Sequence, residues 1–155
     1  RVLRGETDYA ASWVAAKKEE GLRIFRQYVP EPGRHEALWE RLDDNYFQRF
    51  EATEIGWHTR MLWNKLTPDK PIVRARLSPV GEGLQVLVYS PDQPDLFARI
   101  CGYFDNAGFS IQDAKIHTTR AGYALDTFQV TSTPNPVIRK PGSMPRMRVR
   151  ESGDE

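Results

Sequence analysis

The sequence predicts an α+β protein in which a helical N-terminal part is followed by a small β-sheet that carries one helix. In residues 1–66 apolar side chains recur at three- and four-residue steps among many charges, as on amphipathic helices. From residue 72 onward the apolar period is two, which is typical of strands. The segment TPDKP at residues 67–71 breaks both patterns, so we place the boundary there.

The helical part is expected to contain three helices. The segment PEPG at residues 30–33 ends the first one, because two prolines and a glycine cannot continue a helix. A second helix is expected from about His35 to Phe50. Thr53 resembles an N-cap, and apolar residues at helical spacing predict a third helix that continues to Leu66.

The second part is expected to have the element order β-β-α-β-β. Alternating residues predict strands over 72–77 and 84–89, joined as a hairpin by the turn residues SPVGEG. The apolar face of residues 96–104 predicts a helix, which the segment NAG at residues 106–108 ends. Strands over 109–118 and 123–130 follow, and the segment RAG between them is short enough for an antiparallel turn.

The last part of the chain, residues 131–155, is rich in Thr, Ser, Pro, Gly and Arg, with prolines at positions 134, 136, 141 and 145. This composition does not favour a packed helix, and we expect a mobile tail or the remnant of a domain end. The run from Met147 to Arg150 is its one strand-like segment, which either adds an edge strand or lies free.

Composition excludes several classes of function. A chain of 155 residues with 39% hydrophobic content holds one ordinary core, or a small domain with a helical appendage, and not two catalytic domains. The 22 Lys and Arg residues balance 21 Asp and Glu residues, so no overall field favours nucleic acid or a membrane surface. No apolar run approaches the roughly 18 residues of a transmembrane helix.

Three reactive side chains have ordinary structural explanations. His58 has no second ligand at metal spacing, so we expect it to pack. His117 alternates with Lys115 and Asp113, which usually marks a solvated strand face. Cys101 is the one cysteine and lies on an apolar helix face, and the absence of a disulfide framework suits a cytoplasmic location.

The segment SPDQPDL at residues 90–96 connects a predicted strand to a predicted helix. Free backbone N–H groups and the positive end of the helix dipole attract a carboxylate at such a place, which suits an amino acid ligand. Asp92 or Ser90 is the expected helix cap. The structural alternative is that the polar residues only cap the helix, as every such connection requires.

Two segments around this predicted helix resemble a known domain family. The segments VYSPDQPDLFA (residues 88–98) and NAGFSI (residues 106–111) are similar to an ACT domain, which has a ferredoxin-like fold and senses small ligands, usually amino acids. The resemblance implies a βαββ core, here with an extra N-terminal edge strand over the first predicted strand. The second helix of such a domain has no counterpart in the sequence after Thr131.

Residues 83–128, together with FQRF (residues 47–50) and EIGWHTR (residues 54–60), resemble the C-terminal region of the bacterial PII uridylyltransferase/uridylyl-removing enzymes. The resemblance divides the chain into a helical linker (1–66), a first ACT domain (71–130) and the tail (131–155). It implies a parent enzyme that attaches UMP to the PII signalling protein and removes it. Because the chain begins at Arg1 without a methionine, we expect it to be part of a longer protein.

By the same resemblance, this part is a non-catalytic sensor whose effector is glutamine. The implied ligand contacts come from two segments: Asp92, Gln93, Pro94, Asp95 and Leu96 in the first, and Asn106, Phe109, Ser110 and Ile111 in the second. The family pattern usually has glycine at the position of Asp95, and a carboxylate there would repel the carboxylate of an amino acid but attract its ammonium group.

The implied partners are PII, through the parent enzyme, and a second ACT domain or a second copy of the chain, which would complete a shared site. No cofactor is expected in this chain, because the magnesium that the family uses belongs to catalytic domains outside it. The alternative function is a protein interaction or dimerisation module that binds no small ligand.

Overall fold

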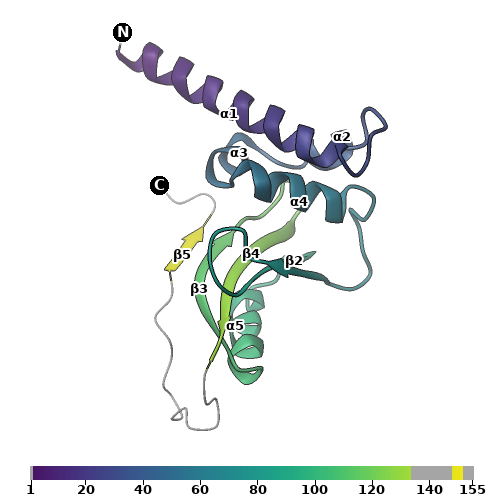
Figure 1. Ribbon diagram of the computed structural model, residues 1–155, viewed down its shortest axis with the longest axis vertical. Coiled ribbons are helices and arrows are strands. Elements are labelled where there is room, and N and C mark those ends of the chain that lie inside the picture. The colour runs from purple at the N-terminus through teal and green to yellow at the C-terminus, as the bar shows by residue number, and fades with distance from the viewer. Residues whose placement is uncertain (1, 134–147, 152–155) are drawn as a thin grey trace. The chain divides into compact units, whose positions relative to one another are not determined.

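The computed structural model describes residues 2–133 and 148–151, and the chain forms two compact units, Arg1–Pro68 and Asp69–Glu155 (Figure 1). The first unit is helical and the second contains the sheet. The first unit consists of α1 (Val2–Arg26), α2 (Glu36–Trp39), α3 (Asp44–Arg49) and α4 (Ala52–Leu62).

The single helix predicted from His35 to Phe50 is wrong, because the chain forms α2 and α3 there with a break between them. Asp43 causes the break. Its backbone is extended (φ −114°, ψ 178°), and its side chain accepts a hydrogen bond from the N–H of Tyr46 at 3.1 Å. A short acidic side chain in this position is a strong N-cap, so the helix restarts after it.

Helix α4 begins two residues earlier than predicted and ends at Leu62 instead of Leu66. Glu51 is its N-cap, and a reciprocal capping box joins Glu51 to Glu54, whose carboxylate accepts from the Glu51 N–H at 2.8 Å. Glycines allow α1 and α4 to pack closely, since a Cβ on Gly56 would lie 2.7 Å from Cγ2 of Ile24.

A buried lysine stabilises the end of α3. The ammonium group of Lys17, on α1, donates hydrogen bonds to the carbonyl oxygens of Gln48 at 2.8 Å and Phe50 at 3.0 Å. The last carbonyl groups of a helix have no intrahelical donor and carry partial negative charge, so a cation is favourable there.

Over its described residues, the second unit is a five-stranded sheet with one helix. Its elements are β1 (Ile72–Leu77), β2 (Leu84–Pro91), α5 (Leu96–Asn106), β3 (Phe109–Ile116), β4 (Tyr123–Ser132) and β5 (Arg148–Glu151). The strand order is β1-β2-β4-β3-β5, and all pairs are antiparallel except β3 with β5. The predicted α+β class, the order β-β-α-β-β and the extra N-terminal edge strand are confirmed.

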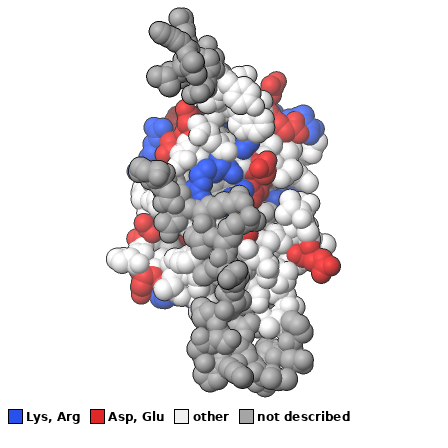
Figure 2. Space-filling view, turned by 90° about the vertical axis from the view of Figure 1, so that its left-hand side faces the viewer, with Lys and Arg blue, Asp and Glu red and all other residues white. Residues whose placement is uncertain are grey.

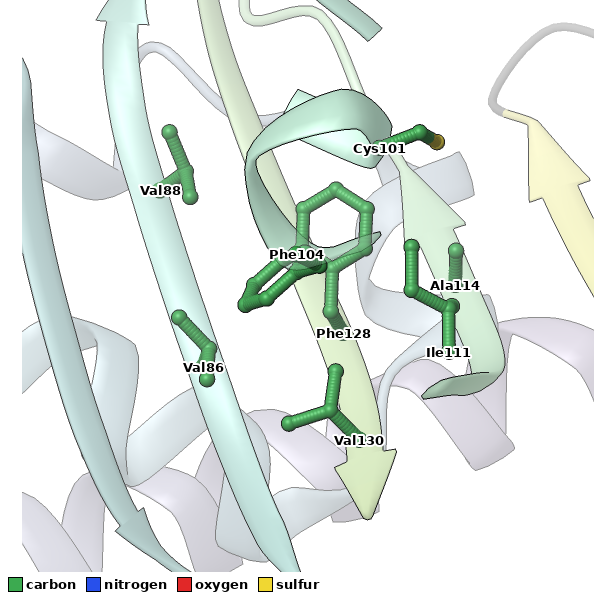
Figure 3. Close-up of a cluster of buried hydrophobic side chains, with 8 residues drawn as sticks. All are labelled: Val86, Val88, Cys101, Phe104, Ile111, Ala114, Phe128 and Val130. Carbon is green, nitrogen blue, oxygen red and sulfur yellow. The ribbon is translucent and has the colours of Figure 1, made fainter. Parts of the chain in front are cut away.

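The core of this unit lies between α5 and one face of the sheet. Figure 3 shows Phe104 of α5 against Phe128 of β4, with side chains of β2 and β3 on either side. Alternate residues of a strand point to the same face of the sheet, and residues that pair across neighbouring strands share that face. Val86, for example, lies opposite Phe128. The buried members of the core are Val86, Val88, Cys101, Phe104, Ile111, Ala114, Phe128 and Val130.

The strand-like run predicted near the C-terminus forms β5, which pairs in parallel with β3 from Asp113 to Ile116. Residues 134–147, which include Met147, lie outside the described residues. The expectation that no second helix forms in this segment therefore stays a prediction. None of the described helices combines the length and the apolar character that a membrane crossing requires.

Candidate functional site

A cavity of about 430 Å³ lies at the N-terminal end of α5, on the side of the sheet that the helix covers. Two groups of residues form it. One belongs to the β2–α5 connection and the first turn of the helix, and the other to the end of β3 and the facing part of β4. The lining residues are Asp92, Gln93, Pro94, Leu96, Phe97, Ile116, Thr118 and Asp126.

Backbone hydrogen bonds hold the β2–α5 connection in place. The N–H of Asp92 donates to the carbonyl of Gly122 at 3.0 Å, which ties the end of β2 to the turn before β4. The N–H of Leu96 donates to the carbonyl of Gln93 at 3.1 Å and closes a turn at the start of α5. The rim of the cavity is therefore a fixed part of the sheet unit.

The first turn of α5 has N–H groups available for a ligand. The N-cap is Asp95 and not Asp92 or Ser90 as predicted, and its side chain makes no capping hydrogen bond. The first N–H to bond along the helix is that of Arg99, to the carbonyl of Asp95 at 3.0 Å. The N–H groups of Phe97 and Ala98 thus have no intrahelical acceptor.

Arg99 lies one turn further along the helix and contacts the connection on its exposed side. Its guanidinium donates to the side-chain oxygen of Gln93, and its Nε lies 3.4 Å from the Asp95 carboxylate. Both side chains of this ion pair are more than half exposed, at 56% and 68%, so it contributes little stability. Asp95 is not among the lining residues of the cavity.

Asp126 supplies a buried carboxylate to the cavity. It lies opposite Val88 in the register of β2 and β4, and its residue is 1% exposed. Its Oδ1 accepts a hydrogen bond from the backbone N–H of His117 at 3.2 Å. Asp126, with Ile116, Thr118 and Phe97, was missed by the sequence analysis, although a carboxylate among inward apolar positions of a strand is a visible signal.

The structure places the two predicted groups of ligand contacts at opposite ends of α5. Asp92, Gln93, Pro94 and Leu96 line the cavity, whereas Asn106 ends the helix, which over 11 residues is about 15 Å long. Ile111 and Phe109 belong to the core cluster or pack against it, and the hydroxyl of Ser110 lies 3.2 Å from that of Thr133. Within one chain these groups do not form a common site.

The three reactive side chains are all buried. His58 packs in the helical unit, with its ring 5.2 Å from that of Phe50. The prediction that His117 lies on a solvated face is wrong, because it is 1% exposed. Cys101 belongs to the core, as its place on the apolar helix face predicted, and burial raises the pKa of its thiol.

Charges on the surface are mixed. On the face in Figure 2, Lys and Arg side chains lie among Asp and Glu side chains over the described atoms, and neither sign covers a continuous area. This arrangement agrees with the net charge of +1. Among the described residues, no group of three His, Cys, Asp or Glu side chains is placed to hold a metal ion.

Comparison with known proteins identifies the relatives of the chain. A family model described as "Uridylyltransferase GlnD fifth domain" matches residues 9–61. A protein of Ralstonia nicotianae named bifunctional uridylyltransferase/uridylyl-removing enzyme is 54% identical over 142 residues, which are 92% of this chain and 16% of that protein. Over most of its length the chain is therefore similar to a part of these bifunctional enzymes. The resemblance seen in the sequence is confirmed.

Two further uridylyltransferase/uridylyl-removing enzymes agree with this assignment. The relative from Cupriavidus metallidurans is 53% identical over 131 residues, and that from Cupriavidus pinatubonensis is 55% identical over 132 residues. Each match covers 84% of this chain and 15% of the relative. The chain thus spans about a sixth of the length of the curated relatives it matches. No solved structure matches it.

Proposed function

We propose that this chain is a glutamine-sensing regulatory part of an enzyme that uridylylates and deuridylylates the PII signalling protein, and that it has no catalytic role itself. The observation that carries the proposal is the cavity at the start of α5. Its lining combines the first turn of α5, whose first N–H groups have no intrahelical acceptor, with apolar side chains and a buried carboxylate, and its volume of about 430 Å³ suits a small ligand.

The family relationship supports a regulatory role. The relatives carry out two opposite reactions according to their name, and the chain corresponds to about a sixth of their length. An effector bound to such a part changes the balance of the two reactions only if its affinity differs between the two states of the enzyme. The cavity provides a place where that difference would arise.

Isothermal calorimetry with glutamine tests the proposal directly. The wild-type chain is expected to release or absorb heat on glutamine addition and to melt at a higher temperature with glutamine present. Glutamate serves as the comparison ligand, since it differs from glutamine by the replacement of an amide with a carboxylate. The absence of both heat and melting shift with glutamine at millimolar concentration contradicts the proposal.

A pair of variants tests whether glutamine binds in this cavity. Thr118 is an exposed lining residue, so Thr118→Phe narrows the cavity without disturbing the core. Thr53→Phe is the matched control, because it makes the same change at an exposed position of α4. We expect the first variant to lose glutamine binding and the second to keep it. If both variants lose glutamine binding to the same extent, or if neither loses it, the assignment of the ligand to this cavity is contradicted.

Self-association is the second candidate function. An apolar groove of about 700 Å³ runs between β1 and α5, lined in part by Val73, Ile100 and Tyr103. Val73 is 53% exposed, Leu77 81% and Tyr103 70%, which is a large exposed apolar area for one small unit. Sedimentation decides between the candidates: a monomer at high concentration that responds to glutamine contradicts the second, and a glutamine-insensitive dimer contradicts the first.

A further inference from the structure

Asp126 is an exception in the pattern of β4. The strand alternates, and the side chains of Phe128 and Val130 belong to the core that α5 covers. Asp126 is two residues before Phe128, so it points to the same face, at the end of the core nearest the helix N-terminus. At 1% exposure, a carboxylate in this position costs free energy unless hydrogen bonds and charges balance it.

The orientation of this carboxylate is fixed by the neighbouring strand. Its Oδ1 accepts the hydrogen bond of the His117 N–H at 3.2 Å, just beyond the end of β3. The residue also lines the cavity, together with Thr118, which follows His117. Asp126 is therefore a carboxyl group that is held in a fixed position in the lining of the cavity.

Another part of the lining has the opposite polarity. Leu96 and Phe97 line the cavity and belong to the first turn of α5, which carries N–H groups without an intrahelical acceptor and the positive end of the helix dipole. Of the described residues that line the cavity, none is Lys or Arg, whereas Asp92 and Asp126 are among them. A ligand with only negative groups would meet two carboxylates, and a simple amine would leave the helix N-terminus unused.

A free α-amino acid has both groups that this lining can bind, an ammonium and a carboxylate on the same carbon atom. We infer that Asp126 binds the ammonium group of the amino acid in this cavity while the first turn of α5 binds its carboxylate. The inference rests on the proposed function and names the residue that selects an α-amino acid within the same site. It also gives Asp126, and not Asp95, the role of ammonium partner.

The variant Asp126→Asn tests the inference. Asparagine keeps the size of the side chain and an Oδ1 acceptor for the His117 N–H, so the variant is expected to fold, which its melting curve checks. The probes are glutamine and glutaramate, the same molecule without its amino group. Wild-type chain is expected to prefer glutamine, and the substitution is expected to weaken glutamine about 10- to 100-fold, the range of a charge-assisted hydrogen bond.

Glutaramate binding is expected to stay within about threefold of its wild-type value in the same variant, because that probe has no ammonium group to lose a partner. Asp92→Asn is the matched control. It makes the same chemical change at an exposed lining residue, where solvent screens the charge, so a smaller effect on glutamine is expected.

Two outcomes overturn the inference in a chain that binds glutamine. Unchanged glutamine affinity in Asp126→Asn shows that the carboxylate does not contact the ligand. Equal weakening of glutamine and glutaramate shows that the residue supports only the shape of the cavity. A wild-type chain that ignores glutamine but binds another amino acid contradicts the proposed function alone, and that amino acid and its deaminated analogue then replace the probes. A chain that binds no amino acid overturns both.

Discussion

The hydroxyl of Tyr46 lies 2.6 Å from Nδ1 of His58 inside the helical unit, and neither residue has any exposed surface. Burial raises the pKa of Tyr46 well above its ordinary value, and the charge of Glu54 adds to the effect. The phenol therefore stays protonated at neutral pH. Whether the hydroxyl or the ring N–H donates depends on the histidine tautomer, but in either case the bond joins α3 to α4.

Replacing Tyr46 by phenylalanine is expected to destabilise the helical unit by about 1–3 kcal/mol. The substitution removes a buried hydroxyl, and water does not take over its hydrogen bond with His58. Denaturant unfolding followed by helical circular dichroism measures the change. Tyr28→Phe is the control: Tyr28 is 55% exposed, and its contact with Arg60 is made by the ring, which phenylalanine keeps. Equal stability of the two variants would contradict the structural role of the Tyr46–His58 contact.

Much of the fold was predictable because sequence periodicity reports burial. Residues 84–130 alternate or repeat as the structure requires, and the glycine-containing segments fall at the turns. The break at Asp43 was not predicted, although two successive aspartates before a buried Tyr46 indicate an N-cap. Apolar spacing continues from Leu38 through Leu42 to Tyr46 across the break, so periodicity alone suggested one helix.

Only the part of the candidate site that is contiguous in sequence was predicted. The connection after β2 is contiguous in sequence, and its polar residues indicate a helix start with free N–H groups. The pairing of β3 with β4 brings Asp126 and Thr118 to the same cavity. Such a pairing cannot be predicted from the sequence of either segment alone. The second predicted segment, around Asn106, lies at the far end of α5, outside this cavity.

His35 gives the helical unit a pH dependence. Partial burial lowers the pKa of His35, with Arg26 adding to the effect and Glu36 opposing it. Its folded-state pKa is thus below its unfolded one, so the folded state binds fewer protons. The stabilisation is fully present above the unfolded-state pKa of about 6.5 and is lost as the pH falls below it. We expect the melting temperature to drop more between about pH 7.5 and about pH 5.5 in wild-type chain than in His35→Gln. Identical drops would contradict this assignment.

Cys101 is expected to react slowly with alkylating reagents in the folded chain. It is 9% exposed in the core beside Phe104, and burial raises the pKa of its thiol, so little of the reactive thiolate is present at neutral pH. Mass spectrometry after timed iodoacetamide treatment measures the rate. The same chain in concentrated urea is the control, in which labelling is expected to be at least about tenfold faster. Comparable rates in the two conditions would contradict the burial of the thiol.

The turn before β2 depends on Gly83. Its φ is +94°, in the left-handed region, and a Cβ there would lie 2.1 Å from the carbonyl oxygen of Val130 on β4. Gly83→Ala must therefore both adopt a strained backbone and push two neighbouring strands apart at Leu84, which pairs with Val130. We expect a loss of at least about 2 kcal/mol in the stability of the sheet unit.

Gly81, two residues earlier in the same turn, is the matched control for this change. A Cβ on Gly81 meets no atom within 4 Å, so Gly81→Ala is expected to change stability by no more than about 1 kcal/mol, in the stabilising direction if the backbone is compatible. Urea unfolding of both variants, followed by the signal of the sheet, makes the comparison. If Gly83→Ala unfolds at the same urea concentration as Gly81→Ala, the close contact between the β1–β2 turn and β4 is not maintained in solution.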